Sequence, residues 1–289
     1  MNLITGTSGN LGKVAAELYL QQNTDQPLAV LSRSAAKVKD LTDKGAELRI
    51  GDYGDYASLV KAFAGIEKIL FVSSNDLENR ELHHKNVIKA AKEAGVKQLL
   101  FTSFQYTSTA ADSPNGLMPV YVASENFLKD SGLDYVILRN GIYMNLLLDI
   151  IGTEIRSNKT LFAPAGDTQV AFTSRNDLAE AAVKVLLSED YSRQTIDLTN
   201  AETVNFPQIA HILSDIIDAD VKFVDPSSAE YQQALAAAGL PAAVVGLFAG
   251  IIASIKAGEF SKTTGDLQHI LGRKPQTVAE FLQTIIQHN

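Results

Sequence analysis

The stretch that decides the fold is the amino terminus, "NLITGTSGNLGKVAAELYLQQ" (residues 2–22). Residues 3–5 near its start, Leu, Ile and Thr, are aliphatic or β-branched, which is typical of a short buried strand. From residue 13 onward, apolar side chains recur at helical spacing. Three glycines lie between the two patterns, so we expect them to form a turn from a strand into a helix.

The three glycines, Gly6, Gly9 and Gly12, have distinct expected uses in such a turn. Gly6 permits the tight bend, Gly9 lets the backbone approach a phosphate, and Gly12 lets the helix pack against the strand. The start of the helix then offers free N–H groups and a positive dipole end to an anion. The turn therefore predicts a phosphate-binding loop formed by residues 6–12, although the spacing is GxxGxxG rather than GxGxxG.

Strand and helix patterns alternate through the following residues. Expected strands cover residues 27–32, 46–52, 67–74, 97–103, 134–140 and 195–200, and expected helices cover 34–45, 56–65, 77–95 and 121–132. Repeated βα units predict an α/β fold of the Rossmann type, with a doubly wound parallel sheet. In such sheets the ligand binds at the carboxyl ends of the strands.

The end of the second strand indicates which dinucleotide binds. An NAD site usually has an acidic residue there for the ribose hydroxyls, whereas this chain has "LSRSAAK". Arg33 can hold a 2′-phosphate with its forked guanidinium, and Lys37 can add a point charge. The alternative is that both are solvated surface residues. We expect NADP(H) rather than NAD(H).

Asp52 follows the third strand in "GDYGD". Its carboxylate can accept a hydrogen bond from the adenine amino group of a dinucleotide. It can equally form the turn beside Gly51, because Asp bonds readily to nearby backbone N–H groups. The two interpretations are compatible.

Composition excludes several classes of function. The net charge is −8 and there is no long basic run, so no nucleic-acid partner is expected. Without cysteine there are no disulfides or thiolate metal sites, and the scattered histidines suggest no metal site. Because the first strand begins at residue 2, we expect no signal peptide and a cytoplasmic protein.

The C-terminal part is expected to be mainly helical. Residues 232–255 contain no charge and are long enough to span a membrane, but Pro241 and glycines interrupt them. We therefore expect helices that line a core or an apolar pocket. The predicted organisation is a dinucleotide-binding domain at 1–145, to which 168–200 return, and a smaller substrate lobe at 146–167 and 201–289.

Several longer motifs then carry a family resemblance over nearly the whole chain. They include "ITGTSGNLG", "SRSAAK", "GDYGD", "FVSS", "VIKAAKEAGVKQLLFTS", "YVASENFLKDSGLDYVILRNGIYMNLL", "SRNDLAEAA" and "ILGRKP". The chain resembles the NmrA-like atypical short-chain dehydrogenases and, among them, type 2 NAD(P)H:quinone oxidoreductases. The resemblance implies a site for NADPH. The cofactor contacts that it implies are Gly6, Thr7, Ser8, Gly9, Asn10, Leu11, Arg33, Lys37, Ser73, Ser74, Thr102, Ser103, Asn140, Gly141, Tyr143 and Arg175, to which the strand and turn patterns add Gly12 and Asp52.

The catalytic machinery departs from the pattern of short-chain dehydrogenases. Those enzymes use Tyr-x-x-x-Lys, whereas "YVASE" has Glu125 four residues after Tyr121. A carboxylate does not help a tyrosine to ionise, so Tyr121 and Tyr143 are only candidate catalytic residues. A quinone needs less acid catalysis than a ketone, because its reduction gives a delocalised phenolate. We therefore expect a quinone or a similar electron-poor planar acceptor.

Five aromatic residues are candidates for the acceptor pocket: Phe104, Tyr106, Tyr143, Phe162 and Phe248. The expected protein is an NADPH-dependent reductase, either a monomer or a homodimer. A second possibility is a non-catalytic regulator that senses NADP(H), as some NmrA-like proteins do. A third possibility, a sugar-nucleotide epimerase, is disfavoured by Glu125.

Overall fold

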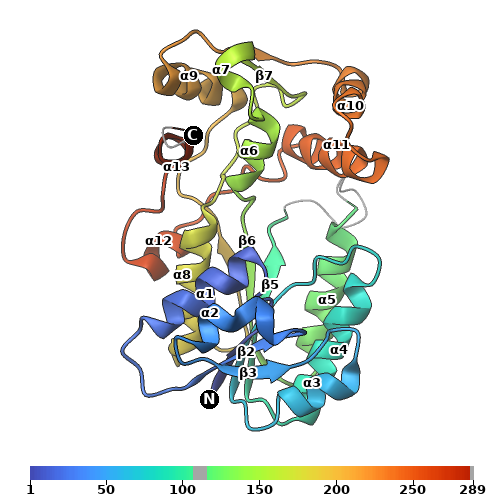
Figure 1. The fold of residues 1–289 in the computed structure, drawn as a ribbon, viewed down its shortest axis with the longest axis vertical. Coiled ribbons are helices and arrows are strands. Elements are labelled where there is room, and N and C mark those ends of the chain that lie inside the picture. Colours follow the sequence, from blue (N-terminus) through green and yellow to red (C-terminus); the bar gives the residue numbers. More distant parts are fainter. Residues whose placement is uncertain (107–115, 287–289) are drawn as a thin grey trace.

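A computed structural model describes residues 1–106 and 116–286, which form two lobes (Figure 1). The larger lobe contains a seven-stranded sheet with the order β3-β2-β1-β4-β5-β6-β8, and every strand pair is parallel. The strands are β1 (Asn2–Ile4), β2 (Leu28–Ser32), β3 (Glu47–Ile50), β4 (Lys68–Val72), β5 (Gln98–Phe104), β6 (Asp134–Asn140) and β8 (Gln194–Leu198). The predicted doubly wound α/β fold is confirmed, with the change of direction between β1 and β4.

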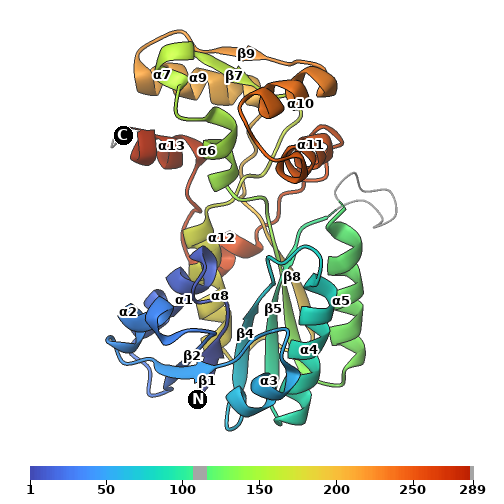
Figure 2. The same cartoon turned by 45° about the vertical axis from the view of Figure 1, so that its right-hand side comes forward.

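Helices cover both faces of this sheet (Figure 2). One face packs against α1 (Asn10–Leu20), α8 (Arg175–Leu187), α12 (Asp266–Leu271) and the short η1 (Ala35–Val38) and α2 (Lys39–Thr42). The other packs against α3 (Tyr56–Ala62), α4 (Arg80–Glu93) and α5 (Met118–Asp130). The alternation of side chains along β1 sends Leu3 to the second core and Ile4 to the first. Burial on both faces explains why β2, β4 and β5 are largely apolar, whereas the edge strands β3 and β8 carry polar and partly exposed residues.

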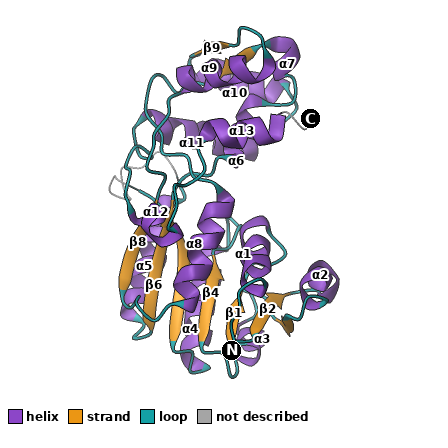
Figure 3. Ribbon diagram, turned by 90° about the vertical axis from the view of Figure 1, so that its left-hand side faces the viewer, coloured by secondary structure: helices purple, strands orange, loops and turns teal. Residues whose placement is uncertain are grey.

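The smaller lobe has a separate apolar core and carries the C-terminal end of the described chain (Figure 3). It contains α6 (Asn145–Ile151), α7 (Ile155–Asn158), β7 (Thr160–Phe162), α9 (Phe206–Ile217), β9 (Lys222–Val224), α10 (Ser228–Ala237), α11 (Ala242–Lys256) and α13 (Val278–Ile286). Strands β7 and β9 form a two-stranded parallel sheet. Because β6 leads directly toward α6, the carboxyl ends of the large sheet lie on the side of this lobe.

Three details differ from the expectation. The predicted helix over 34–45 is broken into η1 and α2, and the small β7–β9 sheet was not predicted. Helix α12 was expected in the smaller lobe, but Leu267 and Leu271 pack in the core between the large sheet and α8. That the larger lobe binds the dinucleotide and the smaller lobe binds the substrate remains a prediction.

The charge-free stretch forms two separate helices, α10 and α11. Between them Gly239 has a φ of +85°, and Pro241 is the N-cap of α11. Within the described residues, no helix combines the length and the apolar character needed to cross a bilayer.

Candidate functional site

The glycine turn links β1 to α1, and two of its glycines are required sterically. Gly6 has a φ of +64°, and an added Cβ would lie 2.9 Å from Cβ of Val72. A Cβ on Gly12 would lie 2.6 Å from the carbonyl oxygen of Thr5 and 2.5 Å from that of Gly6. The turn is thus tight at Gly6, and α1 packs closely against the strand at Gly12, as the sequence predicted.

Gly9 differs from these two because the space beside it is open. Its Cβ would meet only the carbonyl oxygen of Gly6, at 3.3 Å. Gly9 is the N-cap of α1, where no side chain caps the helix and the first turn has no acidic residue. The start of α1 is therefore uncapped and open, which suits a bound phosphate.

The remaining turn residues divide into buried and exposed positions. Thr7 and Leu11 are buried, and the Thr7 hydroxyl donates to the carbonyl oxygen of Leu31 at 3.0 Å. Ser8 and Asn10 are exposed. Thr7 thus ties the turn to the end of β2, while Ser8 and Asn10 face the solvent.

Arg33 and Lys37 lie just after β2 and are both exposed. The side chain of Arg33 is 72% exposed, and its Nη1 lies 3.7 Å from Oδ2 of Asp52. The other carboxylate oxygen of Asp52 accepts from the backbone N–H of Gly54 at 2.9 Å. Asp52 therefore closes a turn and holds Arg33 loosely, which leaves the guanidinium free to reach a 2′-phosphate.

Replacing Arg33 with alanine should remove much of the preference for NADPH over NADH. A charge-assisted contact is worth about 1.5–3 kcal/mol, or about ten- to a hundredfold in affinity. Titration of both cofactors against both proteins measures the ratio. Arg193→Ala, at an exposed arginine before β8, is the control and should leave it unchanged. An unchanged ratio in Arg33→Ala would remove Arg33 from the phosphate site.

At the ends of β4 and β5, predicted site residues bond to one another. The N–H of Ser73 donates to Oγ1 of Thr102 at 3.0 Å, and the Ser73 hydroxyl lies 3.1 Å from the hydroxyl of Tyr121. Tyr121 is 8% exposed and stacks on Phe104 with ring centres 6.0 Å apart. Ser73, Thr102 and Tyr121 thus form one connected group at the carboxyl edge of the sheet.

Ser74, the next residue, is held by two histidines of α4. The N–H of Ser74 donates to Nε2 of His84 at 3.2 Å, and its hydroxyl lies 2.9 Å from Nδ1 of His83. Since Nε2 of His84 accepts, Nδ1 carries the proton and bonds Oγ of Ser124 at 2.7 Å. His83 and His84 are neighbours on α4, and both hold Ser74 in place. The sequence did not predict this contact. No group of residues suited to a metal ion occurs in the described ranges.

His84 should make the stability sensitive to acid. Burial, with the charges of Arg80 and His83, lowers the pKa of His84 to about 3. A lowered pKa means that the unfolded chain binds the proton more readily, so stability present above about pH 6.5 is lost as the pH falls toward 3. The free energy of unfolding should drop by up to about 1.4 kcal/mol per pH unit from this group.

Urea unfolding followed by circular dichroism between pH 7 and pH 4 tests this. His84→Gln, which can still accept from Ser74, should lose this component of the slope. The exposed His211 provides the control variant, His211→Gln, and should retain it. Equal slopes in all three proteins would contradict the assignment.

Ser103 donates a hydrogen bond to a largely buried ion pair between Glu125 and Arg139. Glu125 is 1% exposed and its carboxylate accepts from Arg139 Nε at 2.9 Å, from Arg139 Nη2 at 2.6 Å and from the Ser103 hydroxyl at 2.7 Å. The Tyr106 hydroxyl completes the group at 3.3 Å. Burial alone would raise the pKa of Glu125, but the bonds from Arg139 and Ser103 hold it below its usual value. Glu125 thus pairs with the end of β6, which explains why an acid occupies this position.

Tyr143, which follows β6, lies beside Asn140 at the end of that strand and Arg175 at the start of α8. Nδ2 of Asn140 lies 3.4 Å from the Tyr143 hydroxyl, and the Arg175 guanidinium lies 5.2 Å from the centre of the Tyr143 ring. Burial raises the pKa of Tyr143, and a charge on nearby Tyr121 would raise it further. A Cβ on Gly141 would lie 2.6 Å from Oγ1 of Thr173, so this segment packs tightly.

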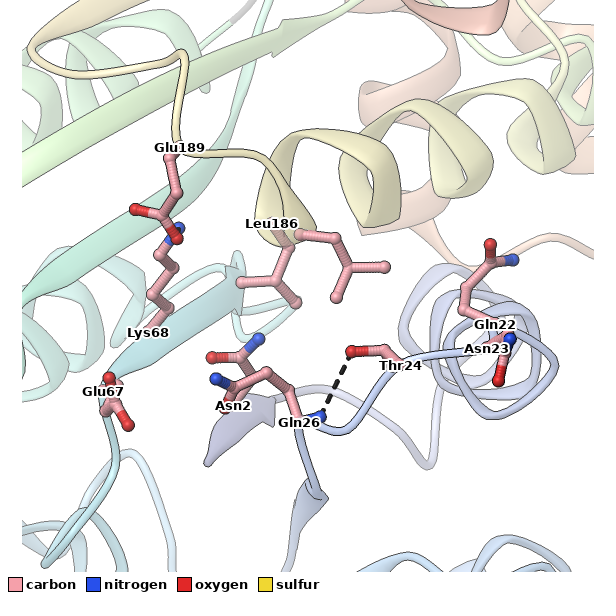
Figure 4. Close-up of a pocket in the computed structure, with 10 residues that line it drawn as sticks. Asn2, Gln22, Asn23, Thr24, Gln26, Glu67, Lys68, Leu186 and Glu189 are labelled. Atoms are coloured by element: carbon pink, nitrogen blue, oxygen red, sulfur yellow. Dashed lines mark hydrogen bonds and ion pairs between the residues drawn. The ribbon is translucent and has the colours of Figure 1, made fainter.

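The five candidate pocket aromatics do not lie together. Phe104, Tyr106 and Tyr143 lie near the carboxyl edge of the sheet, and Phe104 packs against cores of both lobes. Phe162 lines a cavity of about 660 Å³ in the smaller lobe, and Phe248 packs on that lobe's core. A second cavity, of about 260 Å³, is lined by Asn2, Glu67 and Lys68 at the opposite, amino-terminal edge of the sheet (Figure 4). Neither cavity adjoins the glycine turn.

Comparison with known proteins agrees with this geometry. Residues 6–189 match the family model described as NAD(P)H-binding. The chain is 31% identical to quinone oxidoreductase 2 of Escherichia coli over the full length of both chains. It is 25% identical to an NAD(P)H azoreductase of Xenophilus azovorans, covering 97% of this chain and 96% of the relative.

Two solved structures have the same fold. The NADPH complex of an NADPH-dependent quinone oxidoreductase from Escherichia coli matches with a TM-score of 0.93 and 30% identity, covering 99% of this chain and all of the other. Triphenylmethane reductase of Citrobacter sp., with NADP(H), matches with a TM-score of 0.91 and 31% identity over 98% and 99% of the two chains. The chain therefore belongs to the NAD(P)H-binding family and is, as its sequence resemblance implied, an NAD(P)H-dependent oxidoreductase.

Proposed function

We propose that the protein transfers a hydride from NADPH to a quinone or a similar electron-poor planar acceptor. The observation that carries this proposal is the position of Glu125. Its carboxylate is buried against Arg139 and Ser103. A carbonyl reductase has a lysine at this position, which activates the tyrosine. Here the position holds Glu125, whose carboxylate is bound to Arg139 of β6.

The residues present suit the cofactor. The open space at Gly9 and the uncapped start of α1 fit a pyrophosphate, and the exposed Arg33 and Lys37 fit a 2′-phosphate. When bound, the dihydronicotinamide supplies two electrons and one hydrogen as hydride. Ser73, Thr102, Asn140 and Tyr143 are the polar residues that we expect to surround the nicotinamide.

The acceptor's chemistry explains why a strong enzyme acid is dispensable. Reduction of a quinone by hydride leaves one oxygen as a delocalised anion, which takes its proton from water in a later step. The protein then has to bind and orient a planar acceptor. Phe104 and Tyr121, stacked at the junction with the smaller lobe, are suitable aromatic contacts for it.

The names of the relatives support this acceptor class. They include quinone, azo-dye and triphenylmethane-dye reductases. Such acceptors share an extended π system that is poor in electrons. A common requirement for planar, conjugated acceptors is consistent with a site built on aromatic contacts.

NADPH oxidation measured across quinones, ketones and dyes tests the proposal. We expect turnover with quinones and conjugated dyes and little with simple ketones. Preference for ketones would overturn the acceptor assignment. Tight NADPH binding without turnover of any acceptor would favour a regulator that senses NADP(H).

Replacing Tyr121 with phenylalanine should change kcat with a quinone by less than about threefold, because no enzyme acid is needed. A general acid contributes about 10²–10⁴-fold, so the two cases are well separated. Steady-state kinetics with one quinone give the answer. A loss of about a hundredfold or more in kcat, with NADPH binding intact, would show that Tyr121 acts as an acid and would favour carbonyl reduction instead.

A further inference from the structure

Arg80 is a buried cation for which the reaction described so far has no use. It is the first residue of α4 and is 6% exposed. Its Nε and Nη1 are buried and have no hydrogen-bond partner. Within the described residues no carboxylate forms an ion pair with it, since the neighbouring Glu81 pairs with Lys85 at 2.6 Å. Within the described residues its guanidinium is thus largely desolvated and has no carboxylate partner, and its one cation–π contact is with the face of the Tyr121 ring.

The position of Arg80 on the helix adds to this cost. A helix has a partial positive charge at its N-terminus, where a cation is unfavourable and an anion is favourable. A buried charge without a partner is also strongly unfavourable. The charge of Arg80 contributes to the low pKa of His84, so the nearby imidazole stays neutral and adds no second positive charge. The Asp76 carboxylate already accepts from the backbone N–H groups of Glu78 and Asn79 just before the helix. An anion beside Arg80 would therefore act mainly by neutralising the guanidinium.

The guanidinium adjoins the surface that we assign to the acceptor. It lies 5.4 Å from the centre of the Tyr121 ring. Tyr121 stacks on Phe104, and Phe104 contacts Phe260 of the smaller lobe with ring centres 5.4 Å apart. A planar acceptor in contact with Tyr121 would therefore have Arg80 at its margin.

From this geometry we infer that the guanidinium of Arg80 forms a subsite for an oxyanion of the acceptor. The inference rests on the proposed function for the identity of the bound molecule. The oxyanion has two possible sources: an acidic substituent already on the acceptor, such as a sulfonate or carboxylate, or the oxygen that becomes anionic when hydride arrives. Both use the same charge-assisted hydrogen bonds.

A binding experiment tests the subsite without any redox reaction. The probes are 2-naphthalenesulfonate and its uncharged analogue 2-naphthalenesulfonamide, titrated calorimetrically into the protein with saturating NADP⁺. Arg80→Met should weaken sulfonate binding by about ten- to a hundredfold and leave the sulfonamide nearly unchanged. Arg80→Lys should recover part of the difference. Lys89, an exposed cation on the same helix whose Nζ lies 5.9 Å from the Phe127 ring, provides the control Lys89→Met.

Steady-state kinetics distinguish the two sources of the oxyanion. The acceptors are 1,4-naphthoquinone and 1,4-naphthoquinone-2-sulfonate. If the anion is a substituent, Arg80→Met raises KM for the sulfonate alone. If the anion forms on reduction, Arg80→Met lowers kcat for both by a similar factor, while the KM for NADPH is unchanged.

The outcomes separate this inference from the proposed function. Arg80-dependent sulfonate binding without quinone turnover would support the subsite and refute the reductase. Normal turnover in which Arg80→Met changes neither sulfonate affinity nor the kinetics of either quinone would overturn the subsite alone. Thermal unfolding checks that Arg80→Met folds, which we expect because removing an unpaired buried charge stabilises a protein.

Discussion

Replacing Gly9 with valine should weaken NADPH binding by about 10²–10⁴-fold while the protein still folds. The backbone at Gly9 is extended, with φ of −105° and ψ of 174°, which valine adopts without strain. The added Cβ meets only the Gly6 carbonyl oxygen, at 3.3 Å. The methyl groups would occupy the space in front of α1, and the loss of about two charge-assisted bonds to the pyrophosphate gives the stated factor.

Fluorescence titration with NADPH and far-UV circular dichroism are the two measurements. Gly246 provides the matched control, because it lies on α11 with nothing within 4 Å of its added Cβ. Gly246→Val should bind NADPH as the natural protein does. Normal affinity in a folded Gly9→Val protein would show that the phosphate lies elsewhere.

Replacing Glu125 with glutamine should destabilise the protein by about 3–5 kcal/mol at neutral pH, because it leaves the Arg139 guanidinium without its counter-charge. The glutamine has nearly the same shape, so the change isolates the charge. The pKa of Glu125 is held below its usual value, so the pair contributes stability above about pH 4.5 that is lost as the pH falls. The difference between the two proteins should therefore shrink in acid.

Denaturant unfolding at pH 7 and pH 4 measures both effects. The double variant Glu125→Met with Arg139→Met should recover much of the loss, since an apolar pair avoids both desolvation costs. Glu189→Gln is a suitable control, because Glu189 is 87% exposed in its ion pair with Lys68. A loss in Glu125→Gln no larger than in Glu189→Gln would mean that the buried pair is dispensable.

The larger lobe was predictable because its signals are local. The central strands of the sheet are mostly apolar runs between turns, and right-handed βα crossovers fix how such strands assemble. The steric need for glycine at positions 6 and 12 also follows from a strand that turns directly into a helix. These features depend on residues close together in the sequence.

The missed elements depend on distant contacts. Strands β7 and β9 have three residues each, too few for an alternating pattern, and they exist because they pair across about sixty residues. Helix α12 has six residues and is fixed by packing Leu267 and Leu271 near α8. The break between η1 and α2 has no strong helix-breaking residue to announce it.

The candidate site shows the same division. The carboxyl-end rule identified Ser73 and Thr102, which do lie in one hydrogen-bonded group. The ion pair between Glu125 and Arg139 joins α5 to the end of β6, and no local sequence pattern predicts it. Arg80 was missed because arginine in a polar helical turn normally marks a solvated surface, and only the folded chain shows that it is buried.

The packing of α12 against α8 has a consequence for how the polypeptide matures during translation. The sheet's first core contains residues from Ile4 to Leu271, so it cannot be completed until α12 has left the ribosome. The smaller lobe is likewise assembled from segments on both sides of β8. Neither lobe corresponds to a contiguous fragment. We therefore expect a nascent chain that ends before α12 to keep an apolar face of α8 open to chaperones.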